Sequence, residues 1–181
     1  MKATGIVRRI DDLGRVVIPK EIRRTMRIRE GDPLEIFTDN DGEVIFKKYS
    51  PIGELGTFAS QYADTLSKTS GHPILITDKD NVIAVSGVSK KEFAEKKVSQ
   101  ELERVMEEKY AVMPRPGESR KMPAVDGVEK YTASVVCPII SEGDSIGSVV
   151  FLSGEDSGQM GEVEAKLAQS AAGFLGKQME Q

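Results

Sequence analysis

The stretch LGRVVIPKEIRR, residues 13–24, joins three consecutive β-branched residues to a proline and then to a run of arginine. Proline is well tolerated at the first position of a helix, so the sequence predicts a strand over 15–18 that leads directly into a helix over 19–28. Upstream, TGIVRRI (4–10) is typical of another strand, and DDLG (11–14) has the composition of a turn. A strand pair followed by a basic helix is therefore expected.

A hairpin is predicted over 34–48, where two β-rich runs flank Asp39-Asn40-Asp41-Gly42 and the glycine suits a positive φ. The first fifty residues then hold four short strands and one helix, which bury too little surface to be stable without disulfides, metals or a partner chain. With one cysteine and one histidine in the whole chain, an intramolecular disulfide and a zinc site of the usual kinds are excluded. Because apolar residues fall on both faces of the strands, an intertwined homodimer is expected.

Charge is distributed unevenly along the chain. Residues 1–29 carry nine Lys or Arg against three Asp or Glu, whereas residues 51–181 carry 14 against 20. On a helical wheel, the basic residues of the predicted helix occupy a face separate from that of Ile22 and Met26. A solvated helix face is the alternative interpretation, but acids for i, i+4 pairing are nearly absent there. Since arginine suits bidentate contact with phosphate and guanine, the pattern favours double-stranded DNA as the partner.

The run DDLGRVVIPKEIRR and the rest of residues 1–50 resemble the N-terminal domain of the AbrB-type bacterial transition-state regulators. The resemblance implies a swapped-hairpin β-barrel, mainly β, in which each chain of a DNA-binding dimer donates a hairpin. It also implies regulation of sporulation genes, by repression at some promoters and activation at others. The DNA-binding arginines that transfer position by position are Arg8, Arg15, Arg23 and Arg24. We add Lys2, Arg9 and Arg27 as phosphate contacts on charge alone.

Residues 53–181 are expected to form an α+β domain, with 51–71 as a linker and first helix. Hairpins are predicted over 72–87 and 131–154, a charged helix over 90–110 and a closing helix over 160–179. The order of these elements resembles a GAF domain, which implies a small ligand between sheet and helices, near residues 110–131. The predicted apolar residues of the first helix are Ile52, Leu55, Ala59, Tyr62 and Leu66, and those of the closing helix are Val163, Leu167, Ala171, Phe174 and Leu175.

The role of this second domain has two interpretations, signal sensing through an unidentified small molecule and assembly of dimers into a tetramer through its terminal helices. The apolar residues of the first helix could pack either against a partner chain or within their own domain. No cofactor is expected from the sequence.

No catalytic constellation is found, so the chain is not expected to be an enzyme. His72 is predicted to be a surface or capping residue, and Cys137 a buried small hydrophobe in SVVCPII. The loop MPRPGESRKMP (113–123) is expected to be mobile. Without a signal-peptide core or a run of about 18 apolar residues, a cytoplasmic protein that does not enter a membrane is expected.

Two rival interpretations remain. An antitoxin of a toxin–antitoxin pair would use the same N-terminal fold to bind its operator, but the folded acidic second half argues against it. A small-molecule enzyme with an incidental basic helix lacks any catalytic cluster.

Overall fold

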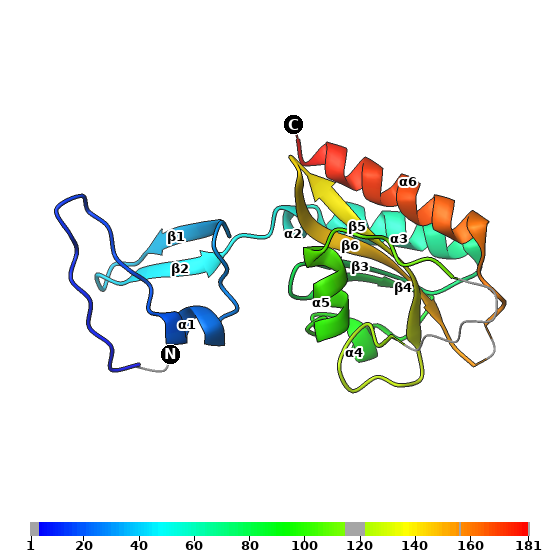
Figure 1. Cartoon of the computed structure of the whole chain (residues 1–181), viewed down its shortest axis with the longest axis horizontal. Helices are drawn as coiled ribbons and strands as arrows, with labels where there is room; N and C mark the ends of the chain where they lie inside the picture. Colours follow the sequence, from blue (N-terminus) through cyan, green and yellow to red (C-terminus); the bar gives the residue numbers. More distant parts are fainter. Residues whose placement is uncertain (1–3, 115–121, 156, 181) are drawn as a thin grey trace. The chain divides into compact units, whose positions relative to one another are not determined.

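The structure is a computed structural model that describes residues 4–114, 122–155 and 157–180. The chain divides into two compact units, Met1–Tyr49 and Ser50–Gln181. Figure 1 shows the first as a short helix beside a two-stranded hairpin, and the second as a sheet covered by helices on both faces. Each unit is described by itself.

The first unit contains helix α1 (Lys20–Thr25) and the antiparallel hairpin of β1 (Leu34–Thr38) and β2 (Val44–Lys48). The strands are in register from Leu34 opposite Lys48 to Thr38 opposite Val44. Between them, Gly42 adopts φ 81°, and the Asp39 carboxylate accepts hydrogen bonds from the backbone of Asp41 and Glu43. The predicted hairpin is confirmed, because aspartate and glycine stand where the turn requires them.

The strands predicted over 4–10 and 15–18 are not formed in the single chain. Neither segment has regular secondary structure, and within the described residues they are joined only at the turn between them, where the Asp11 N–H donates to the Arg15 carbonyl oxygen. Val7 is 86% exposed and Val17 is 70% exposed. The composition favours strands, but a strand also needs a neighbour for its backbone groups, and the described part of one chain provides none.

Helix α1 ends at Thr25, three residues before the predicted end. The backbone turns into the left-handed region at Arg27 (φ 53°), and the Ile28 N–H then donates to the Arg23 carbonyl oxygen at 2.7 Å. A second bond of 3.3 Å runs from the Arg27 N–H to the carbonyl oxygen of Arg24. This is a Schellman ending, in which glycine is the usual left-handed residue. Sequence patterns did not predict it because an arginine stands there.

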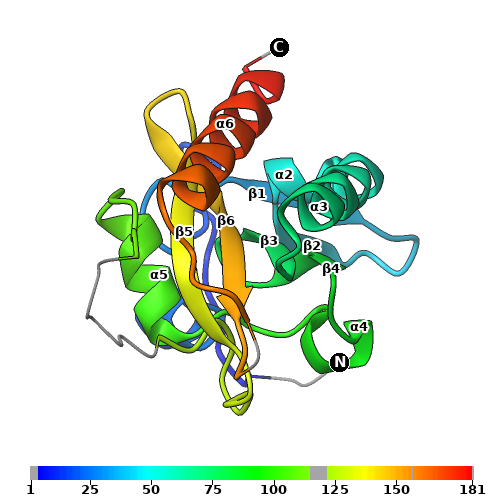
Figure 2. The same ribbon diagram turned by 90° about the vertical axis from the view of Figure 1, so that its right-hand side faces the viewer.

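The second unit is a helix–sheet–helix sandwich. Its antiparallel sheet has the order β4-β3-β6-β5, and Figures 1 and 2 show helices on both faces. The strands are β3 (Ile74–Asp78), β4 (Val82–Ser86), β5 (Thr132–Ser141) and β6 (Asp144–Ser153), and the helices are α2 (Pro51–Glu54), α3 (Gly56–Ser70), α4 (Lys90–Phe93), α5 (Gln100–Glu107) and α6 (Glu162–Gln178). Both predicted hairpins of this unit are confirmed.

Two apolar cores lie on opposite faces of this sheet. One is shared by α3, α6 and strand residues such as Ile76 and Val149. The other joins α4 and α5 to Leu75, Val150 and their neighbours. Side chains along β3 and β6 alternate between the two cores, as the twofold periodicity of a strand requires.

Both of the longer helix predictions in the middle of the chain need correction. The helix over 51–71 is interrupted at Leu55, which separates α2 from α3. The helix over 90–110 is two helices, because the chain leaves α4 at Ala94 (ψ 134°) and passes through Glu95 at φ 60°. Helix α5 then begins at Gln100, and the hydroxyl of the preceding Ser99 accepts a hydrogen bond from the Leu102 N–H as a standard N-cap.

The apolar stripe of α2 and α3 packs within its own unit. Ile52, Ala59 and Leu66 are buried against the sheet, while Leu55 and Tyr62 are half-buried. For α6 the predicted apolar face is partly wrong, since Val163 is 66% exposed and Phe174 is 42% exposed. The buried face of α6 is instead built from small residues: Ala165, Ala168, Ala171, Ala172, Leu175 and Gly176.

Candidate nucleic-acid interface

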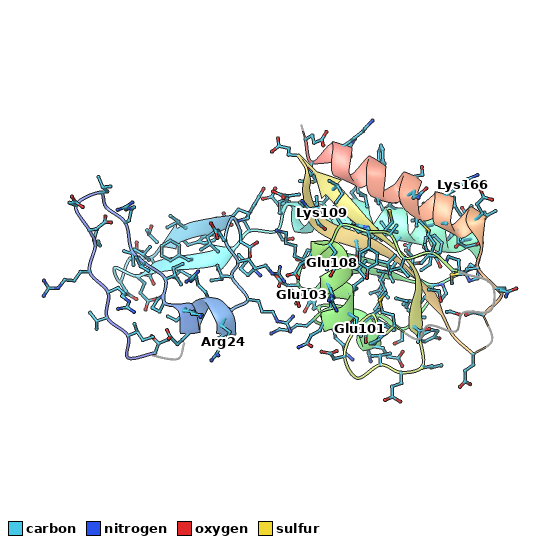
Figure 3. The ribbon with its side chains drawn as sticks, in the orientation of Figure 1. Arg24, Glu101, Glu103, Glu108, Lys109 and Lys166 are labelled. Atoms are coloured by element: carbon cyan, nitrogen blue, oxygen red, sulfur yellow. The ribbon has the colours of Figure 1, made fainter. Side chains whose placement is uncertain are left out.

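Helix α1 carries two exposed arginines in its last turn, Arg23 and Arg24. Figure 3 shows the Arg24 side chain projecting from α1 on the side away from the hairpin. Cations near the carboxyl end of a helix are favoured by the helix dipole, so the helix supports these side chains without needing acidic neighbours. Arg27 follows the helix and is half-buried, which distinguishes it from the freely exposed pair.

Arg15 lies at the end of the turn that begins at Asp11. Its side chain is 69% exposed, and its Nε donates a 2.7 Å hydrogen bond to Oδ2 of Asp11. The Arg15 backbone N–H donates to Oδ1 of the same carboxylate, also at 2.7 Å. These bonds, the backbone one first, hold the pKa of the Asp11 carboxyl below its ordinary value. The carboxylate is therefore ionised at neutral pH.

The remaining basic residues predicted for the site are spread along the extended N-terminal segment. Arg8 and Arg9 are both exposed there, and neighbouring residues of an extended chain face opposite ways. Lys2 lies outside the described residues. The structure thus gives an exposed position to Arg8, Arg9, Arg15, Arg23 and Arg24.

Three residues that sequence patterns did not identify join α1 to the hairpin. The Lys48 Nζ donates to the Arg27 carbonyl oxygen at 2.8 Å and lies 4.0 Å from Oδ2 of Asp32. The Asp32 side chain is only 4% exposed, and it accepts a 2.9 Å hydrogen bond from the Arg29 N–H. Such long-range polar contacts leave no periodic signal in a sequence.

The second unit contains a buried polar pair beneath α5 that sequence patterns did not identify either. The hydroxyl oxygens of Thr77 and Ser148 lie 2.7 Å apart on neighbouring strands, and the Thr77 hydroxyl is 3.8 Å from the Met106 sulfur. Both residues are fully buried. Part of the predicted ligand region over 110–131, and of the predicted loop over 113–123, lies outside the described residues.

The interpretation of His72 as a surface residue is wrong. It is buried between the end of α3 and the start of α6, where its Nε2 lies 3.9 Å from Oε1 of Glu164.

Cys137 is half-buried, and burial raises the pKa of its thiol, the opposite of what a nucleophile requires. The described residues hold no group of three His, Cys, Asp or Glu side chains placed for a metal ion. Within the same residues, none of the helices has the length and apolarity needed to cross a membrane.

With this geometry established, comparison with known proteins identifies the class of the chain. A family model described as stage V sporulation protein T C-terminal, transcription factor, matches residues 54–180. The chain is also 58% identical over 182 residues to stage V sporulation protein T of Bacillus subtilis (strain 168), with 100% of both chains covered. The chain therefore belongs to the stage V sporulation protein T family, so it is a transcription factor and not an enzyme.

Three further similarities concern the separate units. Over 51 residues the chain is 63% identical to the transition state regulatory protein AbrB of Bacillus subtilis (strain 168), which covers 28% of this chain and 52% of that protein. A family model described as antidote-toxin recognition MazE, bacterial antitoxin, matches residues 7–53. The GAF domain of an Acinetobacter phosphoenolpyruvate-protein phosphotransferase covers 69% of this chain and 81% of its own, with 11% identity and a TM-score of 0.57. The second unit thus has the GAF fold, and the predicted two-domain fold class is confirmed.

Proposed function

We propose that the chain regulates sporulation genes in the cytoplasm by binding double-stranded DNA as a dimer. Residues 1–50 would act as the DNA-binding domain, 51–71 as linker and first helix, and 53–181 as the GAF domain for sensing or assembly. The DNA contacts assigned to it are Arg8, Arg15, Arg23 and Arg24, with Lys2, Arg9 and Arg27 as further phosphate contacts. The observation that carries the proposal is the exposed set of guanidinium groups on and beside α1, to which, among the described residues, only the Asp11 carboxylate is bonded, through Arg15.

The dimer is supported by the distribution of exposed apolar side chains. Among the described residues, large exposed hydrophobics number 11 in the first unit, including Val7, Val17 and Phe46, against three in the much longer second unit. Monomeric proteins do not usually expose so much apolar surface in so small a domain. A second copy would pair with the unpartnered segments 4–10 and 15–18 and cover these side chains. It would also double the arginine surface about a twofold axis.

For the second unit we propose assembly of two dimers into a tetramer through α3 and α6. Phe58, Tyr62 and Phe174 form an aromatic cluster on these helices, with ring centroids 5.8–6.2 Å apart. Phe174 keeps 42% of its surface exposed. Phe174→Ser should reduce the mass measured by light scattering from tetramer to dimer and lower the thermal midpoint, because the ring also contacts Phe58 and Tyr62 and because association stabilises the folded state. A wild-type mass that is already dimeric, or a variant that remains tetrameric, would contradict this assignment.

A small-molecule signal is proposed for the opposite face of the sheet, beneath α5. The buried Thr77 and Ser148 hydroxyls offer polar groups in an otherwise apolar core. Native mass spectrometry of protein purified from its own cells would show an added mass if a ligand is retained. The absence of any added mass, with an unchanged mass after addition of cell extract, would leave assembly as the role of the domain.

The experiment for the DNA-binding proposal is a fluorescence-anisotropy titration of the full chain with a labelled promoter duplex from a sporulation gene. We expect binding in the nanomolar range for the wild type, typical of specific complexes at physiological salt, that is, about 10⁻⁸ M or tighter. Arg23→Ala should weaken it about tenfold if the contact is a good bidentate one. Failure of the wild-type chain to bind any duplex would exclude the proposal.

The second candidate function is that of an antitoxin, which is favoured by the family-model match over residues 7–53. It differs in requiring a toxin as a second partner. Affinity purification of the full chain from its own cells tests it. A stoichiometric small protein whose toxicity the chain suppresses would support the antitoxin function, and recovery of DNA with the chain alone would support the regulator.

A further inference from the structure

The turn that presents Arg15 is built around the carboxylate of Asp11. The Asp11 N–H donates to the Arg15 carbonyl oxygen at 3.0 Å, and the Gly14 N–H donates to the Asp11 carbonyl oxygen at 3.0 Å. Oδ1 of Asp11 accepts from the backbone N–H of Leu13 at 3.0 Å and of Arg15 at 2.7 Å. Gly14 has φ 75°, so glycine is needed there. Both side-chain bonds of the turn therefore go to Oδ1, and Oδ2 takes no part in the turn itself.

The first unit contains a second turn with the same construction, over 39–43. The Asp39 N–H donates to the Glu43 carbonyl oxygen, and the Gly42 N–H donates to the Asp39 carbonyl oxygen. Oδ1 of Asp39 accepts from the backbone of Asp41 and Glu43, at 3.1 and 2.9 Å. Gly42 has φ 81°. The two turns form the same four hydrogen bonds at equivalent positions.

The two turns differ in the residue at their fifth and last position, which is Arg15 in the first turn and Glu43 in the second. At Arg15 the guanidinium Nε donates to the second carboxylate oxygen of Asp11, whereas the hairpin turn has Glu43 at the equivalent position. In the part of the chain that the structure describes, the Arg15 guanidinium has no other partner. The Asp11 contact uses one of its five N–H donors and leaves the two terminal nitrogens for a ligand.

From this difference we infer that Asp11 is a positioning residue that holds the Arg15 guanidinium with its terminal nitrogens available to DNA. The inference rests on the proposed DNA-binding function. A free arginine loses much of its rotational freedom when it binds a phosphate or a base, and an arginine already fixed by Asp11 loses less. The ionised carboxylate at neutral pH is consistent with this role.

Simple electrostatics predicts the opposite effect of Asp11 on DNA affinity. A carboxylate beside a polyanion repels it, so removing the charge of Asp11 should strengthen DNA binding if the carboxylate is only a bystander. If Asp11 positions Arg15, removing it should weaken binding. The sign of the effect therefore distinguishes the two accounts.

Asp11→Asn separates the two roles of the carboxylate. The amide oxygen can still accept the backbone bonds of the turn, but the amide nitrogen cannot accept the bond from the Arg15 Nε. Asp39→Asn is the matched control, because it makes the same change in the same turn without an arginine. In anisotropy titrations of the full chain with one promoter duplex, we expect Asp11→Asn to weaken binding about fivefold to tenfold, within the range of a bidentate contact. Asp39→Asn should stay within about twofold of wild type, since its turn makes no assigned DNA contact.

A double-mutant cycle with Arg15→Ala makes the test independent of any general damage to the turn. Asp11→Asn should have no further effect in the Arg15→Ala background. If Asp11→Asn folds poorly, Arg15→Lys provides a second test, because lysine keeps the charge and can still reach a phosphate but lacks the Nε donor that Asp11 holds; it should bind less tightly than the wild type.

Tighter or unchanged binding by Asp11→Asn, or an equal loss in the Arg15→Ala background, would overturn the inference, and so would wild-type affinity in Arg15→Lys. If Arg15→Ala weakens binding while Asp11→Asn does not, only the positioning role fails. If Arg15→Ala itself binds like wild type, the contact assigned to Arg15 fails with it.

Discussion

The ammonium group of Lys48 on β2 donates a 2.8 Å hydrogen bond to the carbonyl oxygen of Arg27, the left-handed residue that follows helix α1. This bond connects the hairpin to the carboxyl end of the arginine-bearing helix. The nearly buried Asp32 carboxylate lies 4.0 Å from the same ammonium group. The position of the arginines therefore depends on a lysine that does not belong to the exposed basic surface.

Lys48→Met tests this connection. It removes the Lys48 ammonium group from the helix-end carbonyl of Arg27 and from the vicinity of the nearly buried Asp32 carboxylate, which should lower the stability of the first unit by about 1–3 kcal/mol. Differential scanning calorimetry of the full chain measures it. Lys47→Met is the control, since Lys47 lies over the Phe37 ring on the hairpin surface, 4.4 Å from its centroid, and should matter less. Equal midpoints for the two variants would exclude the structural role of Lys48.

Val17→Asp tests the dimer. In a single chain Val17 is largely exposed, so the substitution should cost little. In a dimer that covers this segment, an unpaired carboxylate would be buried, and such groups are strongly unfavourable. We expect the mass by light scattering to fall by half and DNA affinity to fall more than tenfold. Val17→Ile, which keeps the apolar surface, should match the wild type. A Val17→Asp chain with wild-type mass and affinity would contradict the dimer.

Two glycines of α6 differ in what surrounds them. A Cβ at Gly176 would collide with the backbone carbonyl of Ile140, whereas a Cβ at Gly173 would meet nothing within 4 Å. Gly176→Ala should therefore destabilise the second unit by about 1–3 kcal/mol, the usual cost of overpacking. Gly173→Ala should stabilise it by about 0.5–1 kcal/mol through helix propensity. Urea unfolding of both variants gives the comparison, and a stable Gly176→Ala would show that α6 is not closely packed on β5.

Glu164→Gln tests the charge at the start of α6. Hydrogen bonding from the Gly161 N–H, together with nearby His72, holds the pKa of Glu164 below its ordinary value. A depressed folded pKa means stability that is fully present above the unfolded value of 4.5 and is lost as pH falls through the folded value. The variant should melt about 1–3 °C below wild type at pH 7, the scale of a modest capping loss.

The same comparison in acid supplies the control, because the difference in melting temperature should shrink toward zero as the pH falls through the folded pKa of Glu164. The Glu162 carboxylate forms an exposed ion pair with Lys166 at 2.7 Å. Glu162→Gln should therefore lower the melting temperature at pH 7 by less than Glu164→Gln does. A difference between Glu164→Gln and wild type that grows in acid would mean that the sign is wrong.

The hairpin of β1 and β2 could be predicted from the sequence because its turn is local: Asp39 and Gly42 stand at fixed offsets and make short-range bonds. The broken helices could not, because Glu95 and Arg27 adopt left-handed backbone with ordinary side chains and no glycine to indicate it. For the site, the family resemblance predicted Arg8, Arg15, Arg23 and Arg24, and all four are exposed; charge alone added Arg9, which is exposed, and Arg27, which is half-buried.

What the sequence could not predict is how the arginines are held. The Lys48 contact spans 21 positions along the chain, and sequence patterns give no indication of such pairs. His72 was predicted to be a surface or capping residue because it stands between Gly71 and Pro73, yet it is buried and lies beside Glu164 of α6. Side-chain position therefore depends on contacts between elements distant in the sequence.

The central claim is that arginines of the first unit bind DNA phosphates, and the salt dependence of binding tests it most directly. The slope of log K against log salt is about −0.9 per phosphate contact. Loss of one contact per chain of a dimer should make the slope shallower by about 1.8. We predict this change for Arg15→Ala and for Arg23→Ala, and none for Lys166→Ala in the second unit. Wild-type affinity and an unchanged slope in both arginine variants would contradict the account.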